Sequence, residues 1–202
     1  MDQIVFDRIN ALARATPWLH PVVLSYATYG PLIFALLLVA GWWRARRHGE
    51  ARQMAAMICA GAATVAAVGI NQPIVNAVHR PRPYTDHVDL VVLATRSADF
   101  SFPSDHAVMA GAAATGLIFV ARGLAAWAMA AALVMAFARV YIAAHYPFDV
   151  VVGLLLGAVV ALAVYGAGHR MLTRAVTVAE NRGRLLRPLL TARPVDAGAG
   201  AR

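Results

Sequence analysis

The stretch RVYIAAHYPFDVVVGLLLGAVVALAVYGAG, residues 139–168, joins a short polar string to a long apolar run. A helix needs about 20 mostly apolar residues to cross a bilayer, and the run after Pro147 is long enough. Proline is well suited to the first turn of a helix, so a membrane-spanning helix is predicted over 147–168. This places Asp149 in the first turn of that helix and His145 just before it.

Further apolar runs upstream predict more helices of the same kind. Fewer than 20 residues suffice where the bilayer thins or helix ends are buried in protein. The first run is interrupted at Gly30-Pro31, so it is either one kinked helix or a short helix followed by a longer one. The expected fold is an all-α, polytopic membrane bundle of about five to six transmembrane helices, in which the earlier spans cover 18–43, 54–78, 104–121 and 124–143.

The composition agrees with a membrane protein. The chain has 202 residues, of which 60% are hydrophobic, and its mean hydropathy of +0.62 is too high for an ordinary soluble domain. Its one cysteine, Cys59, excludes an intrachain disulfide and cannot form a thiolate metal site alone. One domain is expected over residues 1–170, followed by a basic, disordered tail over 171–202.

The positive charge is placed as a topology signal. A net charge of +8 is compatible with nucleic-acid binding, but much of it flanks apolar runs, in loop 44–53 and after His169. Arginine-rich loops stay in the cytoplasm, so nucleic acid is not an expected partner. Counting spans then puts loop 79–103 and the 143–147 turn together on the outer face.

Residues 3–14 have roughly helical spacing of apolar side chains, with polar residues between them. This pattern predicts a short amphipathic helix. It fits a helix lying along the membrane interface and a surface helix packed on the bundle equally well.

His145 and Asp149 form the first candidate catalytic group. A carboxylate four residues on can hydrogen-bond one ring nitrogen of the histidine and leave the other free as a nucleophile. Arg139 lies near the outer end of its span, and an arginine at membrane depth is costly unless it has a function. The spacing therefore predicts a nucleophilic histidine beside a fixed positive charge.

The string Pro103-Ser104-Asp105-His106 opens another predicted span. A helix start offers free N–H groups and a positive dipole end, which favour phosphate. Ser104 is expected to cap the helix or to donate its hydroxyl to a phosphate oxygen. His106, in the first turn, is placed to protonate a leaving oxygen.

The string Arg80-Pro81-Arg82-Pro83 follows the span over 54–78. Proline on either side holds the segment extended and stiff. Guanidinium groups match phosphate oxygens in pairs and stay charged at any working pH. Arg80 and Arg82 are therefore candidate phosphate-binding residues.

Taken together and in this order, the three strings resemble the signature blocks of the type 2 phosphatidic acid phosphatase (PAP2) superfamily. That pattern is a lysine, six residues and Arg-Pro; then Pro-Ser-Gly-His; then Ser-Arg, five residues, His, three residues and Asp. The matching positions here are Arg82-Pro83, Pro103 to His106, and Arg139, His145 and Asp149. The residues within these motifs most resemble those of the bacterial undecaprenyl-diphosphate phosphatase branch. The resemblance covers nearly the whole chain, up to about residue 170.

The chain also departs from this pattern at three places. The expected lysine falls on Val75 when counted back from Arg82, and Asn76 or Arg80 is a candidate substitute. Asp105 replaces the glycine of the second block and is expected to point away or to pair with an arginine. Ala138 stands where the third block has serine.

The resemblance implies a PAP2/chloroperoxidase-like fold and a metal-independent lipid phosphatase. The implied reaction cuts a polyprenyl diphosphate to the monophosphate, for recycling of a cell-wall carrier lipid, at the extracytoplasmic side of a bacterial cell membrane. His145, oriented by Asp149, would form a phosphohistidine, and His106 would be the proton donor. The implied phosphate-binding residues are Arg82, Arg139, Ser104, Asp105 and Arg80.

No acidic cluster with metal-ligand spacing is present, so no metal and no cofactor are expected. Membrane lipids are the other expected partners, and the oligomeric state stays open. The alternatives are a phosphatidate or phosphatidylglycerophosphate phosphatase and, from another class, a lipid scramblase or transporter.

Overall fold

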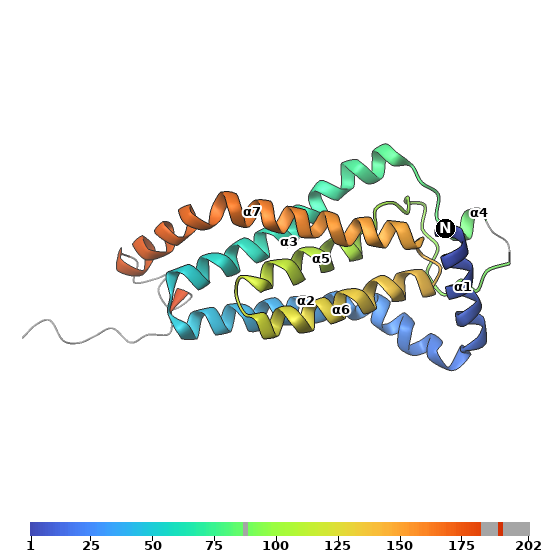
Figure 1. The fold of residues 1–202 in the computed structure, drawn as a ribbon, viewed down its shortest axis with the longest axis horizontal. Coiled ribbons are helices and arrows are strands. Elements are labelled where there is room, and N and C mark those ends of the chain that lie inside the picture. The colour runs from blue at the N-terminus through green and yellow to red at the C-terminus, as the bar shows by residue number, and fades with distance from the viewer. Residues whose placement is uncertain (87–88, 183–189, 192–202) are drawn as a thin grey trace, which may run out of the picture.

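The computed structural model describes residues 1–86, 89–182 and 190–191, and the regular elements in these ranges are helices. They pack side by side into an elongated bundle, with one helix lying across its end (Figure 1). In chain order they are α1 (Asp2–Ala15), a short 3-10 helix (Pro17–Leu19), α2 (His20–His48), α3 (Ala51–Val78), α4 (Pro83–Asp86), α5 (Asp105–Ile118), α6 (Arg122–Tyr141) and α7 (Pro147–Arg182).

Four of these helices are long and apolar enough to cross a membrane, namely α2, α3, α6 and α7. They confirm the predicted spans over 18–43, 54–78, 124–143 and 147–168, and α7 begins at Pro147 as expected. The interruption at Gly30-Pro31 does not split α2, which continues through Pro31 as one helix. Figure 1 shows α2 changing direction along its length, the usual effect of an internal proline.

α5 occupies the centre of the bundle and differs from the expected span over 104–121. It has 14 residues, about 21 Å at the rise of an α-helix, which is shorter than the hydrocarbon core. Its side chains are buried almost all round, Ala110 and Leu117 among them. The surrounding helices α3, α6 and α7 replace lipid as its environment.

α1 packs across one end of the bundle. Phe6 is fully buried, and its ring lies 5.3 Å from that of Tyr146. The side chain of Asn10 exchanges hydrogen bonds with the backbone of Val91, donating over 3.0 Å and accepting over 3.2 Å. Ile4 and Leu12 stay exposed. The helix is thus packed on the bundle and still presents an apolar edge.

α7 extends further than the predicted span and corrects the expected start of the tail. Residues 171–182 continue the helix, because no glycine or proline interrupts this part of the sequence and Val176 is buried in the core. His169, just before the expected tail, shares a hydrogen bond of 3.1 Å with the carbonyl of Arg52. The rest of the expected tail, 183–189 and 192–202, lies outside the described residues.

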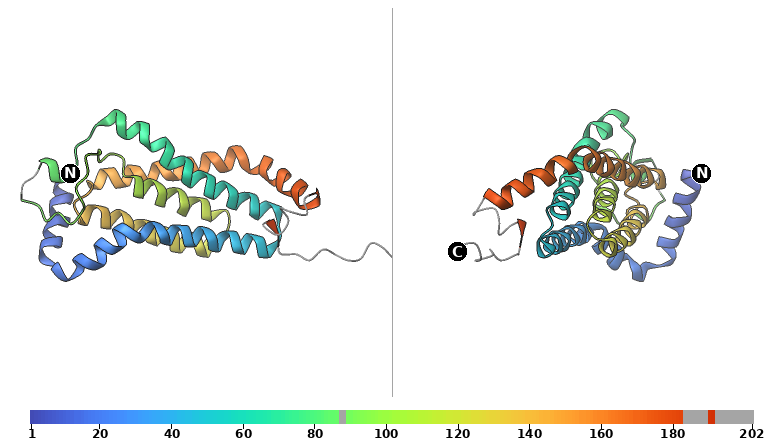
Figure 2. Two further views of the ribbon diagram at one scale, coloured as in Figure 1. Left: turned by 180° about the vertical axis from the view of Figure 1, so that it is seen from behind. Right: turned by 60° about the vertical axis from the view of Figure 1, so that its left-hand side comes forward.

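The antiparallel course of the helices brings separate parts of the chain to one end. The C-terminal ends of α3 and α6 and the starts of α5 and α7 lie together there, beside α1 (Figure 2). Each of the three polar strings belongs to this end. The turn between α5 and α6 lies at the opposite end, with the last residues of α2.

Candidate active site

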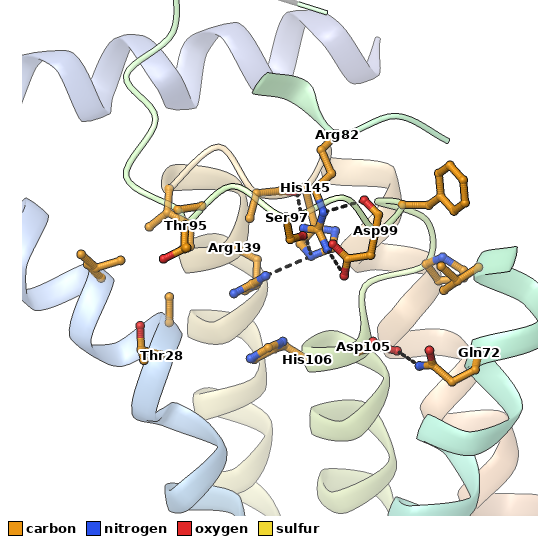
Figure 3. A pocket seen from close by; sticks show the side chains of 18 of the residues that line it. Thr28, Gln72, Arg82, Thr95, Ser97, Asp99, Asp105, His106, Arg139 and His145 are labelled. Atoms are coloured by element: carbon orange, nitrogen blue, oxygen red, sulfur yellow. Dashed lines mark hydrogen bonds and ion pairs between the residues drawn. The ribbon is translucent and has the colours of Figure 1, made fainter. Parts of the chain in front are cut away.

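A cavity of about 390 Å³ opens at the end of the bundle where the polar strings meet. Its walls come from α2, α3, the loop before α5, the first turn of α5 and the end of α6 (Figure 3). Residues from each of the three strings line it. Of the predicted site residues, the lining includes Arg82, Asp105, His106, Arg139 and His145.

His145 is buried, with 3% of its surface exposed, and both ring nitrogens have partners. Nδ1 lies 2.7 Å from the carbonyl oxygen of Ser101. A carbonyl only accepts, so Nδ1 carries the hydrogen and the Nε2 of the neutral ring keeps its lone pair. Nε2 faces the guanidinium groups of Arg139 at 3.2 Å and Arg82 at 3.4 Å. The imidazole is therefore held with its nucleophilic nitrogen toward the cavity's positive charge.

The charge state of His145 follows from the same surroundings. Burial, and then the nearby charges of Arg139 and Arg82, lower the pKa of His145 well below its usual value. The neutral ring is the nucleophilic form. The lowered pKa keeps His145 in this neutral form at neutral pH.

Arg82 is fixed by bonds from three sides. Nη1 donates to the carbonyl of Ala144 at 3.0 Å. Nη2 donates to the carboxylate of Asp99 at 2.9 Å, and Nε donates to the Asp99 carbonyl at 3.2 Å. The Asp99 side chain is 60% exposed. The ion pair between Asp99 and Arg82 is therefore open to an anion that enters the cavity.

Asp149 does not make the predicted hydrogen bond to His145. Its Oδ2 lies 3.9 Å from Nδ1, beyond hydrogen-bonding range, because the carbonyl of Ser101 already holds that nitrogen. Oδ2 instead accepts from the backbone N–H of Tyr146 at 2.9 Å. Oδ1 accepts from Arg80 at 2.5 Å. Asp149 therefore contacts the backbone turn that carries His145 and not the ring itself.

Arg80 corrects a second expectation, because it does not line the cavity. Its guanidinium group bridges the fully buried carboxylate of Asp149 and the carboxylate of Asp2, the latter at 2.6 Å. It also lies 4.2 Å from the centre of the Tyr146 ring. Asp2 in turn accepts from the N–H of Phe148 at 2.8 Å. Arg80 thus ties α1 to the start of α7 and does not reach the cavity.

The start of α5 places the remaining predicted residues. Figure 3 shows His106 below Arg139, within the cavity. Ser104 is fully buried, does not line the cavity, and its hydroxyl has no partner among the described residues. Asp105 lines the cavity and does not pair with an arginine; its carboxylate is turned toward α3 (Figure 3). Its carboxylate accepts from the amides of Asn71 at 2.7 Å and Gln72 at 2.9 Å.

The position at which the family pattern has a lysine, Val75 in this chain, lies in the wall of the cavity. Val75 is buried and lines the cavity, and Asn76 lines it beside Val75. Of the two candidate substitutes, Asn76 reaches the site and Arg80 does not. An amide has replaced a cation on this wall.

Two contributors could not be assigned from the sequence. Asp99 is one of several polar residues in its loop, and nothing in the sequence indicates that it meets Arg82. Ser101 acts on His145 through its backbone carbonyl, which leaves no residue-type signal at all. In the described part of the chain, no group of three or more His, Cys, Asp or Glu side chains is placed to hold a metal ion.

The comparison with known proteins identifies the family. A family model described as the PAP2 superfamily matches residues 55–171. Undecaprenyl-diphosphatase BcrC of Bacillus subtilis is 28% identical over 160 residues, which are 79% of this chain and 80% of that protein. Decaprenylphosphoryl-5-phosphoribose phosphatase of Mycobacterium tuberculosis is 38% identical over 164 residues, which are 80% of this chain and 83% of that protein.

A solved structure shares the fold. It is the PAP2-type phosphatidylglycerolphosphate phosphatase from Bacillus subtilis, which is 19% identical with a TM-score of 0.59. The similarity covers 84% of this chain and 87% of that one. The resemblance seen in the three polar strings is thereby confirmed, and the chain belongs to the PAP2 superfamily of membrane lipid phosphatases.

Proposed function

We propose that this protein removes the terminal phosphate from a polyprenyl diphosphate, through a phosphohistidine formed on His145. The cavity opens at one end of a bundle of membrane-spanning helices, where a lipid presents its head group. The Bacillus subtilis relative named undecaprenyl-diphosphatase supports this class of substrate. The proposal includes the extracytoplasmic side of a bacterial membrane, which the arginine-rich loop at the opposite end favours.

The observation that carries the proposal is the grouping of two imidazoles and two guanidinium groups around one small cavity. The buried Nε of Arg139 has no hydrogen-bond partner among the described residues, and neither does the buried hydroxyl of Ser104. Buried donors are nearly always satisfied in native proteins. A phosphoryl group bound in the cavity would satisfy Arg139.

In the first step the phosphate displaces the carboxylate of Asp99 from Arg82 and takes over the donors that now face Nε2 of His145. The freed Nε2 attacks phosphorus, so that a P–N bond forms as the P–O bond to the lipid breaks. In the complex with the phosphate dianion His106 carries a proton, and it gives that proton to the departing oxygen. The two arginines stabilise the charge spread over the transferred group.

In the second step His106 takes a proton from water, and the oxygen attacks phosphorus as the P–N bond breaks. Inorganic phosphate leaves and His145 returns to its neutral form, with Nδ1 held throughout by Ser101. Every proton transfer in this scheme uses side chains of the chain itself. Metal independence is part of the proposal and is tested below with a chelator.

A second candidate substrate is favoured by the neutral part of the cavity wall. Besides the arginines, the histidines, Asp99 and Asp105, the polar side chains of the lining are hydroxyl and amide groups, namely Thr28, Gln72, Asn76, Thr95 and Ser97. Such groups pair with sugar hydroxyls, and a second phosphate would call for another cation. A polyprenylphosphoryl sugar phosphate is therefore the alternative leaving group, in line with the 38% identical relative.

The test is phosphate release by the purified protein in EDTA, across a panel of lipids. The panel holds a polyprenyl diphosphate, a polyprenylphosphoryl pentose phosphate, phosphatidate and phosphatidylglycerophosphate. We expect release from one of the polyprenyl lipids, and loss of at least about a thousandfold in His145→Ala with lipid binding kept.

His79→Asn is the matched control. It removes an exposed imidazole at the same end of the bundle, and asparagine tolerates the left-handed backbone at this position, where φ is 54°. Full activity is expected in this variant. Unchanged release by His145→Ala would refute His145 as the nucleophile, and no release from any lipid of the panel by the wild type would favour a scramblase or transporter.

A further inference from the structure

A second cavity, of about 700 Å³, lies at the end of the bundle opposite the candidate active site. It is formed by the last turns of α2 and by the turn between α5 and α6 with the first turns of α6 (Figure 1). We call it the arginine groove, after its lining residues Arg44, Arg47 and Arg122. The mechanism proposed above makes no use of it.

The described lining of the arginine groove is positively charged. Three guanidinium groups line it, and no Asp or Glu is among the described residues that do so. Arg47 lies in the last turn of α2, where the helix dipole favours a cation. Arg122 is the first residue of α6, where the dipole end is itself positive, and the N-cap residue Ala121 supplies no side-chain cap. An anion bound there would offset the unfavourable position of Arg122.

The walls of the groove are aromatic and lead into apolar surface. Trp43 and Trp127 are 44% and 72% exposed, and exposed tryptophan at the end of a spanning helix marks the membrane interface. Below Trp43 on the same face of α2 lie Leu36 and Val39, both exposed. Val134 is exposed two turns along α6 from Trp127. A ligand can thus place an anion at the arginines and hydrocarbon along the helices.

We infer that the arginine groove binds the head group of an anionic phospholipid, in the leaflet opposite the candidate active site. The arginines take the phosphate, the tryptophans flank the glycerol region, and the acyl chains lie on the exposed apolar faces of α2 and α6. A basic pocket between spanning helices is a known form of site for anionic lipid head groups. The inference does not depend on the reaction proposed for the other end.

The test measures lipid retention by the purified full chain in detergent, titrated with phosphatidylglycerol or with phosphatidylcholine. Native mass spectrometry counts bound lipid, and the thermal unfolding midpoint reports stabilisation. The variant R44Q/R47Q/R122Q removes the charges of the groove. R52Q/R170Q/R174Q is the matched control, since it removes the same number of exposed arginines outside the groove.

We expect phosphatidylglycerol to bind and stabilise the wild type and the control, and phosphatidylcholine to do neither. The groove variant should bind phosphatidylglycerol at least about tenfold more weakly, because each arginine near an anionic head group contributes about fivefold. Equal binding by the groove variant, an equal loss in the control, or equal binding of phosphatidylcholine would each overturn the inference. If the triple variant elutes as aggregate, the single variant Arg122→Gln is measured in its place, with a loss of about fivefold expected.

Discussion

Arg80 and Arg82 are two positions apart, yet their side chains serve different parts of the molecule. Arg82 lines the cavity, and Arg80 lies between the carboxylates of Asp2 and Asp149. The proline-flanked string predicts fixed, extended arginines. It does not predict which of them faces the phosphate, because the partner of Arg80 on α1 is 78 residues away in the sequence.

This difference predicts unequal effects of removing the two charges. Arg82→Gln should lower kcat/KM by about 10²–10³-fold, as expected for a donor to the transferred phosphoryl group. It should also weaken inhibition by inorganic phosphate. Arg80→Gln should lower activity less and leave phosphate inhibition unchanged, because its contacts are with Asp2 and Asp149. Equal loss of phosphate inhibition in the two variants would contradict the assignment.

The neutral state of His145 predicts a pH dependence. Its pKa is held well below the usual value by burial and by the charges of Arg139 and Arg82. Protonation of His145 should therefore not limit kcat/KM until the pH is below about 6.5. In Arg82→Gln one of the opposing charges is gone, so the pKa of His145 should rise and the acid limb of kcat/KM should move to higher pH. An acid limb at the same or lower pH in that variant would argue against this electrostatic account.

Most of the chemistry-bearing side chains could be named from the sequence, because His106, Arg139 and His145 are polar exceptions in apolar runs. The partner that orients His145 could not. Spacing suggests the carboxylate of Asp149, but the carbonyl of Ser101 holds the ring, and backbone groups are identical at every position. The pairing of Asp99 with Arg82 likewise depends on a loop path that carries no periodic signal.

α5 and α7 approach closely along a stripe of small residues, and this contact aligns both halves of the site. A methyl group on Gly157 would lie 2.0 Å from the carbonyl oxygen of Val108, and one on Gly111 would lie 2.3 Å from that of Leu154. These clashes are with backbone, which cannot move aside as a side chain can. His106 is carried by one helix of this pair and Asp149 by the other.

Gly157→Ala should therefore lower stability by about 1–3 kcal/mol through overpacking. Gly61→Ala is the matched control, because its added methyl group meets nothing within 4 Å. There the loss of glycine from a helix interior should be neutral or stabilising by up to about 1 kcal/mol. The measurement is the midpoint of thermal unfolding in one detergent. A Gly157→Ala protein as stable as Gly61→Ala would show that the α5–α7 contact is looser than described.

The helices themselves were largely predictable, because apolar runs bounded by arginine, proline and glycine define them. The errors have physical causes. α5 needs no full span of lipid-facing residues, since protein surrounds it, and α7 continues past residue 168 because Val176 still packs in the core. Of the two alternatives left open for the first span, α2 takes the single helix with an internal proline at Pro31. None of these follows from hydropathy alone, which does not distinguish lipid from protein as an apolar environment.

The whole molecule has two unlike ends, with the candidate active site at one and the arginine groove at the other. Counting spans from the sequence placed the polar strings on one side, and the structure agrees on their convergence. The shape of each cavity was not predictable, because it depends on how separate segments pack. Residues of several segments line the cavity of the candidate active site, and the arginine groove lies between the end of α2 and the start of α6.

The two ends should face opposite sides of the membrane. In a Cys59→Ser background, Ala98→Cys and Gly123→Cys place single exposed thiols at the active-site end and at the far end, respectively. An impermeant maleimide added to intact cells should label Ala98→Cys, whereas Gly123→Cys should react only after the cells are opened. The reverse pattern would contradict the proposed orientation, and equal labelling in intact cells would contradict a spanning bundle.

The proposal that His145 becomes phosphorylated is tested most directly by trapping the intermediate. The wild-type protein is mixed with the active polyprenyl lipid, quenched within one turnover in alkaline denaturant, digested and analysed by mass spectrometry. The account predicts phosphate on the peptide that carries His145, and no phosphate in His145→Ala treated in the same way. Phosphate found on another residue, or a burst of product without any phosphorylated histidine, would contradict it.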